Sequence, residues 1–395
     1  MKLTDVCEFI VDCPHSTALD EGRGYPLIRT PNIGKGRLLL ENVHRVSEKV
    51  YQERIQRGQP QDGDLIFARE APAGNVAIIK NGEKVCLGQR TVLIRPNKDK
   101  VNSTFLAYYL LAPKQQNGLL GSANGSTVPH VNLPTIRNLE ISLPSLEKQV
   151  KTASIIESYD DLIENNQKQI KLLEEAAQRL YKEWFVDLRF PGWENTKIVD
   201  GVPEGWEKTT ISSVSSVLRR GISPKYNDNA TFTVINQKCI RQTIVDFSES
   251  RKQEKTFSSE MALIDSDTVI CSTGAGTLGR VGQVFGSPTN ATFDSHVTLV
   301  RTNGRIGAQL LFQSLKDQQT YLQDSGKGST NQLELSRTTI AECPVFIPSE
   351  SVSKHFEVLV QPIHDLISKI SQSILSLQNS KDMMLSKLMN DELEW

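Results

Sequence analysis

The sequence predicts an α+β protein in which two mixed α/β domains are joined by two long helices. Residues 145–185 form a Glu/Lys/Gln/Leu-rich run without Gly or Pro, which is typical of a long helix. A second helical run with the same spacing follows near the C-terminus, where Ile367 stands 204 residues after Ile163. Each run comes after a stretch of short β-rich segments and turns. The chain is therefore predicted to be an internal duplication.

Mostly apolar residues recur at alternating spacings of three and four along one face of each helix, as in a coiled coil. The first seam consists of Ile163, Asn166, Ile170, Leu173, Ala177, Leu180 and Trp184. The second consists of Ile367, Ile370, Ile374, Leu377, Lys381, Met384 and Leu388. Because the two seams match, we expect the helices to form an intramolecular antiparallel coiled coil with a pseudo-twofold axis. In the expected register Asn166 lies opposite Lys381.

Turn residues divide the chain into five predicted segments. They are a first mixed domain at 1–143, a central helix at 144–188, a linker at 189–205, a second mixed domain at 206–347 and a C-terminal helix at 348–395. Ser145 is expected to cap the central helix. Pro362 is expected to bend or break the second helix early, because it lacks an N–H group.

Short β-rich runs separated by turns predict strands in both domains. In the first domain the strands are expected at 26–30, 64–68, 76–79 and 91–94, with one short helix near Ser103–Leu111. Residues 267–271 match 64–68 and residues 297–301 match 91–95, whereas the loops between them differ. One scaffold with two sets of loops indicates two related but non-identical targets.

Composition narrows the functional class. No apolar run approaches the roughly 20 residues of a membrane span, and Asp5, Glu8 and Asp12 exclude a signal peptide at the N-terminus, so we expect a cytoplasmic protein. The net charge of −1 argues against a wholly basic nucleic-acid binder. Because the helical segments are acidic and the domains neutral to mildly basic, an anionic partner would meet local patches on the domains. The six scattered cysteines are expected to be reduced thiols.

Catalytic motifs are absent from the sequence. It contains no P-loop, HExxH or GxSxG motif. Residues 274–279 match GxGxxG, but the following residues 280–284 are typical of a strand rather than of the helix that a dinucleotide site needs. Cys7, Cys13 and His15 lack a fourth ligand at usable spacing for a zinc site. We therefore predict a non-catalytic chain that binds no metal.

Polar loops beside the predicted strand ends offer groups suited to phosphate oxygens and base edges. For each residue alone, a solvated charge or a turn is the simpler interpretation, and Trp193 and Trp206 are expected to anchor the linker. The candidate nucleic-acid-contacting residues are Arg29, Lys35, Arg69, Gln89, Arg90, Ser126, Thr127, His130, Asn132, Arg219, Arg220, Lys225, Ser272, Thr273, His296, Lys327, Ser329 and Thr330.

The order of these elements resembles the specificity subunit of type I restriction–modification enzymes. The resemblance rests on residues 125–132 (GSTVPHVN), 139–149 (LEISLPSLEKQ) and 203–207 (PEGWE), and it covers essentially the full chain. The first domain departs from the pattern because it lacks a Pro-x-Gly-Trp start. The second half has residues 331–335 in place of the Pro-His-x-Asn run, so its loop contacts need not be equivalent.

This resemblance implies a non-catalytic subunit whose two domains each bind one half of a bipartite, asymmetric DNA site, with the helices setting the spacer. The implied partners are double-stranded DNA, two methyltransferase subunits that methylate adenine with S-adenosylmethionine, and motor/endonuclease subunits that use ATP and Mg²⁺. One alternative is a specificity subunit of a related system with a fused methyltransferase–nuclease partner. Another is a two-headed protein-binding scaffold on a coiled coil.

Overall fold

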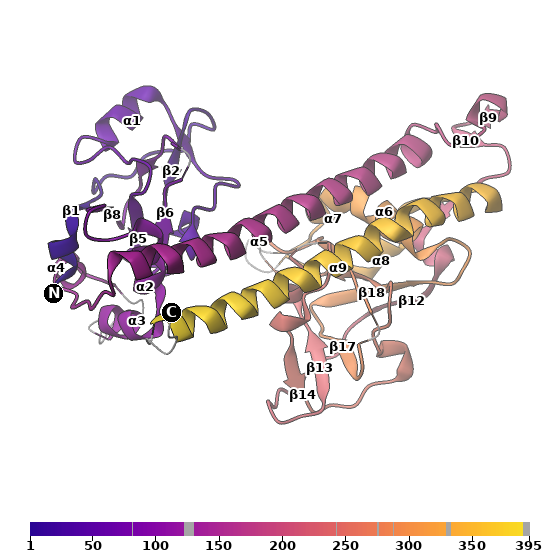
Figure 1. Cartoon of the computed structure of the whole chain (residues 1–395). Helices are drawn as coiled ribbons and strands as arrows, with labels where there is room; N and C mark the ends of the chain where they lie inside the picture. Colours follow the sequence, from indigo (N-terminus) through magenta and orange to yellow (C-terminus); the bar gives the residue numbers. More distant parts are fainter. Residues whose placement is uncertain are drawn as a thin grey trace. The chain divides into compact units, whose positions relative to one another are not determined.

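The computed structural model describes residues 1–80, 82–121, 130–241, 243–274, 276–286, 288–328 and 333–389. The chain divides into two compact units. Unit 1 combines Met1–Glu164 with the residues from Leu375 onward, and unit 2 consists of Asn165–Ile374. The two long helices, α5 (Leu146–Tyr181) and α9 (Glu350–Met389), each contribute to both units (Figure 1). The five segment boundaries given above stay predictions.

Unit 1 is built on a five-stranded sheet in the order β1-β8-β5-β6-β3, beside a three-stranded sheet in the order β4-β2-β7. The strands are β1 Cys7–Asp12, β2 Tyr25–Ile28, β3 Gly36–Arg37, β4 Arg45–Val46, β5 Leu65–Ala68, β6 Val76–Ile78, β7 Cys86–Leu87 and β8 Thr91–Pro96. The helices are α1 Glu48–Arg54, α2 Ser103–Leu111, α3 Pro113–Leu120 and α4 Leu133–Arg137. The predicted helix at Ser103–Leu111 is thus confirmed as α2.

Unit 2 repeats this plan with a four-stranded sheet in the order β12-β18-β15-β16 and a three-stranded sheet in the order β14-β13-β17. Its strands are β9 Ile198–Val199, β10 Val202–Pro203, β11 Glu207–Thr210, β12 Ser215–Arg220, β13 Phe232–Ile235, β14 Arg251–Gln253, β15 Thr268–Cys271, β16 Val281–Gln283, β17 Ala291–Phe293, β18 Val297–Thr302 and β19 Pro344–Ile347. Its helices are α6 Ala308–Asp317, α7 Gln319–Asp324 and α8 Arg337–Ala341.

The duplication extends to irregular details of the two main sheets. β1 pairs antiparallel with β8, and its register shifts between Cys7 and Phe9. β12 pairs antiparallel with β18, and its register shifts between Ser215 and Val217. The matches between β5 and β15 and between β8 and β18 are therefore confirmed as topological equivalents. The outer strands β1 and β12 were missed, because their polar and apolar residues do not form a continuous apolar run.

The opposite ends of these sheets are held by equivalent buried ion pairs. In unit 1 the Arg95 guanidinium donates through Nε and Nη2 to the two carboxylate oxygens of Asp64, at 2.9 and 2.8 Å. In unit 2 Arg301 makes the same bidentate contact with Asp267, at 2.7 Å for each bond. Both carboxylate side chains are almost completely buried. The paired arginines therefore neutralise carboxylates that could not be buried alone.

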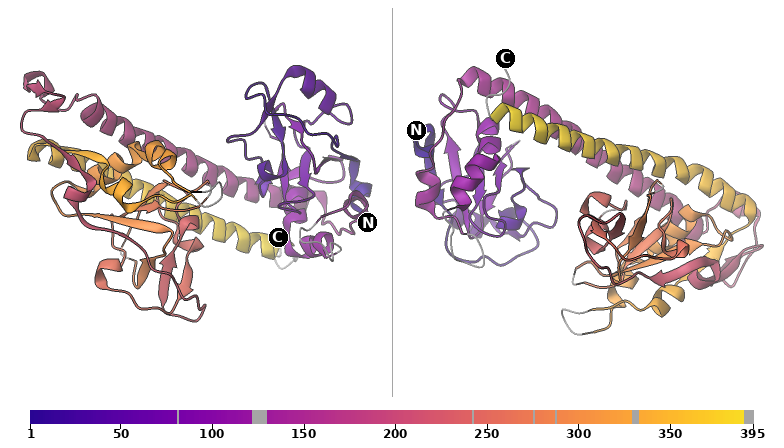
Figure 2. Two further views of the ribbon diagram at one scale, coloured as in Figure 1. Left: turned by 180° about the vertical axis from the view of Figure 1, so that it is seen from behind. Right: turned by 90° about the horizontal axis from the view of Figure 1, so that it is seen from below.

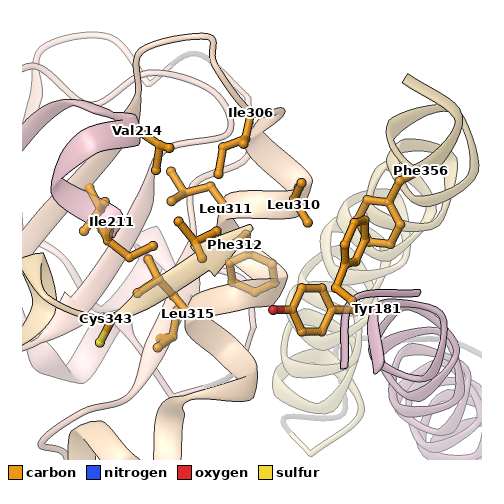
Figure 3. Close-up of a cluster of buried hydrophobic side chains, with 14 of the residues drawn as sticks. Tyr181, Ile211, Val214, Ile306, Leu310, Leu311, Phe312, Leu315, Cys343 and Phe356 are labelled. Atoms are coloured by element: carbon orange, nitrogen blue, oxygen red, sulfur yellow. The ribbon is translucent and has the colours of Figure 1, made fainter. Parts of the chain in front are cut away.

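The helices run antiparallel within each unit. In unit 2 the C-terminal half of α5 packs on the N-terminal half of α9, where Tyr181 and Phe356 meet with ring centroids 6.5 Å apart. Figure 3 shows these two rings facing the buried side chains of α6, among them Leu310 and Phe312. Burial raises the pKa of Tyr181 to about 12. The helix pair and its domain therefore share one apolar core in unit 2.

In unit 1 the N-terminal part of α5 packs beside the C-terminal part of α9, and Figure 2 shows the two segments side by side from two further directions. Lys381 Nζ lies 2.7 Å from Asp160 Oδ1 and 3.3 Å from the Tyr108 hydroxyl. The expected position of Lys381 opposite Asn166 is therefore wrong, because Lys381 meets a carboxylate six residues earlier in α5. A charged partner compensates a buried ammonium better than an amide does.

Most of the predicted seam residues are buried or half-buried. The buried ones are Ile163, Ile170, Ala177, Trp184, Ile367, Ile370 and Ile374. The half-buried ones are Asn166, Leu173, Leu180, Leu377, Lys381 and Met384, whereas the side chain of Leu388 lies outside the described residues. Which of these residues pair with each other across the two helices stays a prediction.

Each long helix contains one irregular feature, which is Pro362 within α9 and a π-helical turn at the end of α5. α9 continues through Pro362 as one helix, so the expected break is wrong. Pro362 leaves the Val358 carbonyl without its helical N–H, and the Val358 residue is 69% exposed, so water can replace that donor. At the end of α5 a π-helical turn spans Lys182–Val186.

Within this π turn the Asp187 N–H donates to the Lys182 carbonyl at 2.8 Å. Trp184 and Phe185 are both buried there and both pack against Phe356. Ser145 caps the start of α5 as expected, since its Oγ accepts from the Lys148 N–H at 3.4 Å. Trp206 is buried and packs 4.5 Å from Phe190, whereas Trp193 is 41% exposed. Only Trp206 therefore anchors the linker through packing.

Candidate nucleic-acid interface

The main sheet of unit 1 ends in a polar edge. β1 ends at Asp12, β5 ends at Ala68, and β8 begins at Thr91, and strand pairing brings these ends together. The next residues continue the contact, because the Arg69 N–H donates to the Arg90 carbonyl at 2.9 Å. We use "edge 1" for the five residues whose side chains interact here, which are Asp12, Arg69, Glu70, Arg90 and His130.

Arg69 is the centre of edge 1. Its guanidinium donates to Asp12 Oδ2 at 2.8 Å, to the Val131 carbonyl at 2.9 Å and to His130 Nε2 at 2.9 Å. Its side chain is only 12% exposed. A guanidinium has no acceptor, so His130 Nε2 must accept this bond and Nδ1 then carries the proton. Arg69 thus ties the ends of two strands to the segment around residue 130.

Glu70 joins the buried and exposed parts of edge 1. One carboxylate oxygen accepts from His130 Nδ1 at 2.5 Å, and the other lies 2.9 Å from Arg90 Nη1. The Glu70 side chain is 19% exposed, whereas that of Arg90 is 62% exposed. Edge 1 therefore runs from a fixed interior arginine to an arginine that extends into solvent.

The equivalent edge of unit 2 carries different side chains on the same backbone pattern. The Ser272 N–H donates to the His296 carbonyl at 2.8 Å, as Arg69 does to Arg90 in unit 1. The Leu335 N–H donates to the Ser272 carbonyl at 2.9 Å, as Val131 does to Arg69. We use "edge 2" for Arg220, Ser272, Thr273, His296 and Glu334.

Edge 2 contains a single ion pair, between Arg220 at the end of β12 and Glu334. Arg220 Nη2 also donates to the Ser272 carbonyl at 3.3 Å. Thr273 Oγ1 and His296 Nδ1 share a hydrogen bond of 2.5 Å, and His296 is exposed. The Ser272 hydroxyl is buried against Thr298 at 2.5 Å. Where edge 1 has two arginines and two carboxylates, edge 2 thus has one of each.

The other predicted residues of unit 1 lie around edge 1 or away from it. Gln89 adjoins Arg90, and its Nε2 donates to the His15 carbonyl at 2.8 Å. Arg29 is half-buried beside Gly88, and its backbone N–H donates to Asn32 Oδ1 at 3.1 Å. Lys35 and Asn132 are exposed.

Of the remaining predicted residues in unit 2, Arg219 and Lys225 engage carboxylates outside edge 2. Arg219 Nη1 lies 3.1 Å from Glu260, and Lys225 is paired with Glu254. The hydrogen bond to Glu254 raises the pKa of the exposed Lys225 ammonium. Lys327 is exposed, and its backbone exchanges hydrogen bonds with Glu334. The predicted residues Ser126, Thr127, Ser329 and Thr330 lie outside the described residues.

Sequence reasoning missed the carboxylates of both edges. Asp12 was unrecognised because β1 was not predicted, and Glu70 and Glu334 stand in loops without a motif. A cation–π contact in unit 2 was also missed, in which the Arg251 guanidinium lies 3.6 Å from the ring centroid of the exposed Tyr226. An alternating Arg-Lys-Gln-Glu-Lys run at 251–255 was the available signal.

The described residues also bear on nucleotide, metal and membrane sites. The GxGxxG match at 274–279 is followed by strand β16, as expected, and not by a helix. Among the described residues there is no group of three or more His, Cys, Asp or Glu side chains that could hold a metal ion. In the same residues no helix is long and apolar enough to cross a membrane.

Comparison with known proteins identifies relatives that cover most of the chain. Residues 1–175 match the family described as Type I restriction modification DNA specificity domain. The chain is 27% identical to the type I restriction enzyme MjaIX specificity subunit of Methanocaldococcus jannaschii, over 99% of this chain and 92% of that protein. The resemblance to type I specificity subunits is confirmed.

Two further similarities cover most of the chain. The type I restriction enzyme HindI specificity subunit of Haemophilus influenzae is 23% identical over 84% of this chain and 86% of that protein. The crystal structure of a type I restriction-modification S subunit from M. genitalium aligns with a TM-score of 0.57 at 15% identity, covering 98% of this chain and 95% of that one. At this identity the structural likeness shows the fold, which confirms two mixed domains joined by long helices.

Proposed function

We propose that this chain is the DNA specificity subunit of a type I restriction–modification complex and that each domain binds one half of a bipartite, asymmetric site. The observation that carries this proposal is the pair of sheet edges. The sheets that carry edges 1 and 2 share one strand order, and the two edges share the same backbone hydrogen bonds. Their side chains differ at equivalent positions. Two copies of one scaffold with different polar groups are suited to two different half-sites.

The proposed chain is non-catalytic, and the chemistry belongs to its partners. Two methyltransferase subunits would use S-adenosylmethionine to methylate adenine, and motor/endonuclease subunits would use ATP and Mg²⁺. The outer faces of the long helices support this arrangement, since Leu172 is 65% exposed, Val358 69% and Leu366 45%. Exposed apolar side chains on otherwise polar helices are suited to protein partners.

The central test is to map methylated adenines in DNA from cells that carry this chain with its methyltransferase partners. A bipartite motif with one methylated adenine in each half is expected. Replacing residues 1–143 by the corresponding domain of another specificity subunit should change one half-site and leave the other unchanged. A change in both halves, or in neither, contradicts the two-reader proposal.

The helices are proposed to set the spacer between the half-sites. Inserting one heptad into both α5 and α9 preserves the seam, because a heptad restores the apolar face. The methylated motif should then keep both half-sites and gain spacer base pairs. An unchanged spacer rejects this role. Salt-sensitive DNA binding by the assembled complex would exclude the alternative of a protein-binding scaffold.

A further inference from the structure

The two edges share one exposed position. Arg90 immediately precedes β8, and His296 immediately precedes β18. The backbone carbonyl of each accepts a hydrogen bond from the residue that follows β5 or β15, Arg69 or Ser272. Each side chain is also held by the next residue of the same loop, Glu70 in unit 1 and Thr273 in unit 2. This position therefore combines exposure with a fixed backbone and a side-chain tether.

We propose that Arg90 and His296 are equivalent specificity-determining residues, each of which contacts the edge of one base pair, and that Glu70 and Thr273 position them. This inference rests on the proposed DNA-specificity function and assigns the residues that perform it. It also assigns different roles to Arg90 and the neighbouring Arg69, although both side chains carry a guanidinium.

Arg69 is unsuited to base reading because its guanidinium is committed inside the protein. Its Nε, Nη1 and Nη2 each donate to a protein acceptor, which are Val131, Asp12 and His130. Withdrawing the side chain for a base would leave the carboxylate of Asp12, 15% exposed, without this partner. Arg69 is therefore a positioning residue that fixes the edge from which Arg90 projects.

Arg90 has the geometry that Arg69 lacks. Its side chain is 62% exposed and touches Glu70 through Nη1. A guanidinium carries five N–H donors, so the contact with one carboxylate oxygen leaves donors for a bidentate bond to guanine O6 and N7. The tether also reduces the side-chain entropy that binding would otherwise remove. We therefore assign a guanine to this position of the first half-site.

His296 offers a weaker and more permissive contact in unit 2. Its Nδ1 is occupied by Thr273 Oγ1, so the remaining ring nitrogen, Nε2, can make one hydrogen bond to a base edge. A single bond discriminates less than a bidentate pair. The second half-site should accordingly be read less strictly at this position than the first.

The test compares methylated motifs for the complete complex with the wild-type chain, with Arg90→Ala and with His296→Ala. Arg90→Ala should reduce discrimination at one base pair of the first half-site by about tenfold to a hundredfold. His296→Ala should reduce discrimination at one base pair of the second half-site by about fivefold. In each case the other half-site should stay unchanged. Lys98→Ala removes an exposed cation beyond the opposite end of β8 and should leave the whole motif unchanged.

The positioning role of Glu70 has its own readout. Glu70→Gln should relax the same base pair as Arg90→Ala does, and the double variant should match Arg90→Ala rather than show the product of the two losses. Arg90→Lys keeps the positive charge but loses the planar pair of N–H donors, so it should discriminate no better than Arg90→Ala. A purely structural role for Glu70 would instead lower methylation at an unaltered motif.

Several outcomes overturn the inference. If Arg90→Ala lowers methylation uniformly without altering the motif, Arg90 is a phosphate contact. If it alters both halves, the edges do not act separately. Unfolding midpoints for the variants must equal that of the wild type, and Arg90→Gln replaces Arg90→Ala if the latter fails this control. Absence of a bipartite motif with the wild-type chain would reject the proposed function itself, which distinguishes the two failures.

Discussion

In each unit a domain helix contacts a long helix at an equivalent position, but different polar groups make the contact. In unit 1 Tyr108 of α2 donates to Asp160 of α5, which also meets Lys381. In unit 2 Gln313 of α6 donates to His364 of α9 at 3.0 Å, and His364 Nδ1 lies 2.9 Å from Gln283 Oε1. His364 stands 204 residues after Asp160. One contact is ionic and the other is neutral.

Burial explains this difference. The side chains of Lys381 and Asp160 are 13% and 24% exposed, so both charges keep some contact with water. His364 is only 1% exposed, and burial lowers its pKa to about 4. A charge at that depth would lose its hydration without an opposite charge in contact. The backbone is therefore repeated in the two units, whereas the polar groups differ with local solvent access.

The largest expected effect comes from breaking the ionic contact of unit 1. Asp160→Ala leaves Lys381 mostly buried without its carboxylate, which should destabilise unit 1 by about 3–4 kcal/mol. Hydrogen exchange of α2 amides, measured on the full chain, reports this loss. The amides of α6 in unit 2 serve as the internal control and should exchange as in the wild type. Equal acceleration in both units would contradict a local contact.

A smaller effect is expected from acidifying the neutral contact of unit 2. The pKa of His364 is lowered from 6.5 to about 4 by burial. Between these values the unfolded chain binds the proton and the folded chain does not, so stability falls as pH decreases. From pH 7 to pH 4.5 this group should remove about 2 kcal/mol of unfolding free energy.

Burial also raises the pKa of two carboxyl groups in unit 2, Glu357 and Asp267, so His364 is not the sole source of pH dependence. The His364 contribution is therefore measured as the difference between the wild type and His364→Gln in urea unfolding at each pH. The difference should shrink toward low pH. A constant difference would show that His364 does not carry the titration.

A third experiment makes the unit 1 contact apolar. The double variant Asp160→Leu/Lys381→Met replaces both charged groups by apolar side chains. It should recover much of the stability that Asp160→Leu alone loses, with a coupling of about 1–3 kcal/mol. Hydrogen exchange of α2 amides provides the measurement. Additive losses would mean that Lys381 and Asp160 do not act as a pair.

The smallest effect is expected at the exposed ion pairs that begin the long helices. Glu147 pairs with Lys151 in α5, and Glu350 pairs with Lys354 in α9, both at i,i+4 spacing. All four side chains are more than half exposed. Lys151→Ala and Lys354→Ala should leave the urea midpoint unchanged within error. A clear loss in either would show that these charges contact more than each other.

Much of this structure could be predicted from the sequence. The duplication, both long helices, α2 and the buried strands β5 and β8 follow from periodicity, because apolar spacing specifies which face is buried. The register of the two helices could not be predicted in this way, because Lys381 pairs with Asp160 beside Tyr108 of the domain. The edges were only partly predictable. Exposed Arg90 and His296 could be suspected by residue type, but the contacts of Asp12 with Arg69 and of Glu334 with Arg220 depend on tertiary structure.

The π turn at Lys182–Val186 has a consequence for the direction in which the chain leaves α5. Successive residues of an α-helix point about 100° apart, so neighbours do not share one face. The additional residue of an i→i+5 turn absorbs that angle, and Trp184 and Phe185 both reach Phe356. The turn thus resets the rotational phase of the helix before the linker begins. Deleting one residue within it would turn the linker by about 100° and misdirect Trp206.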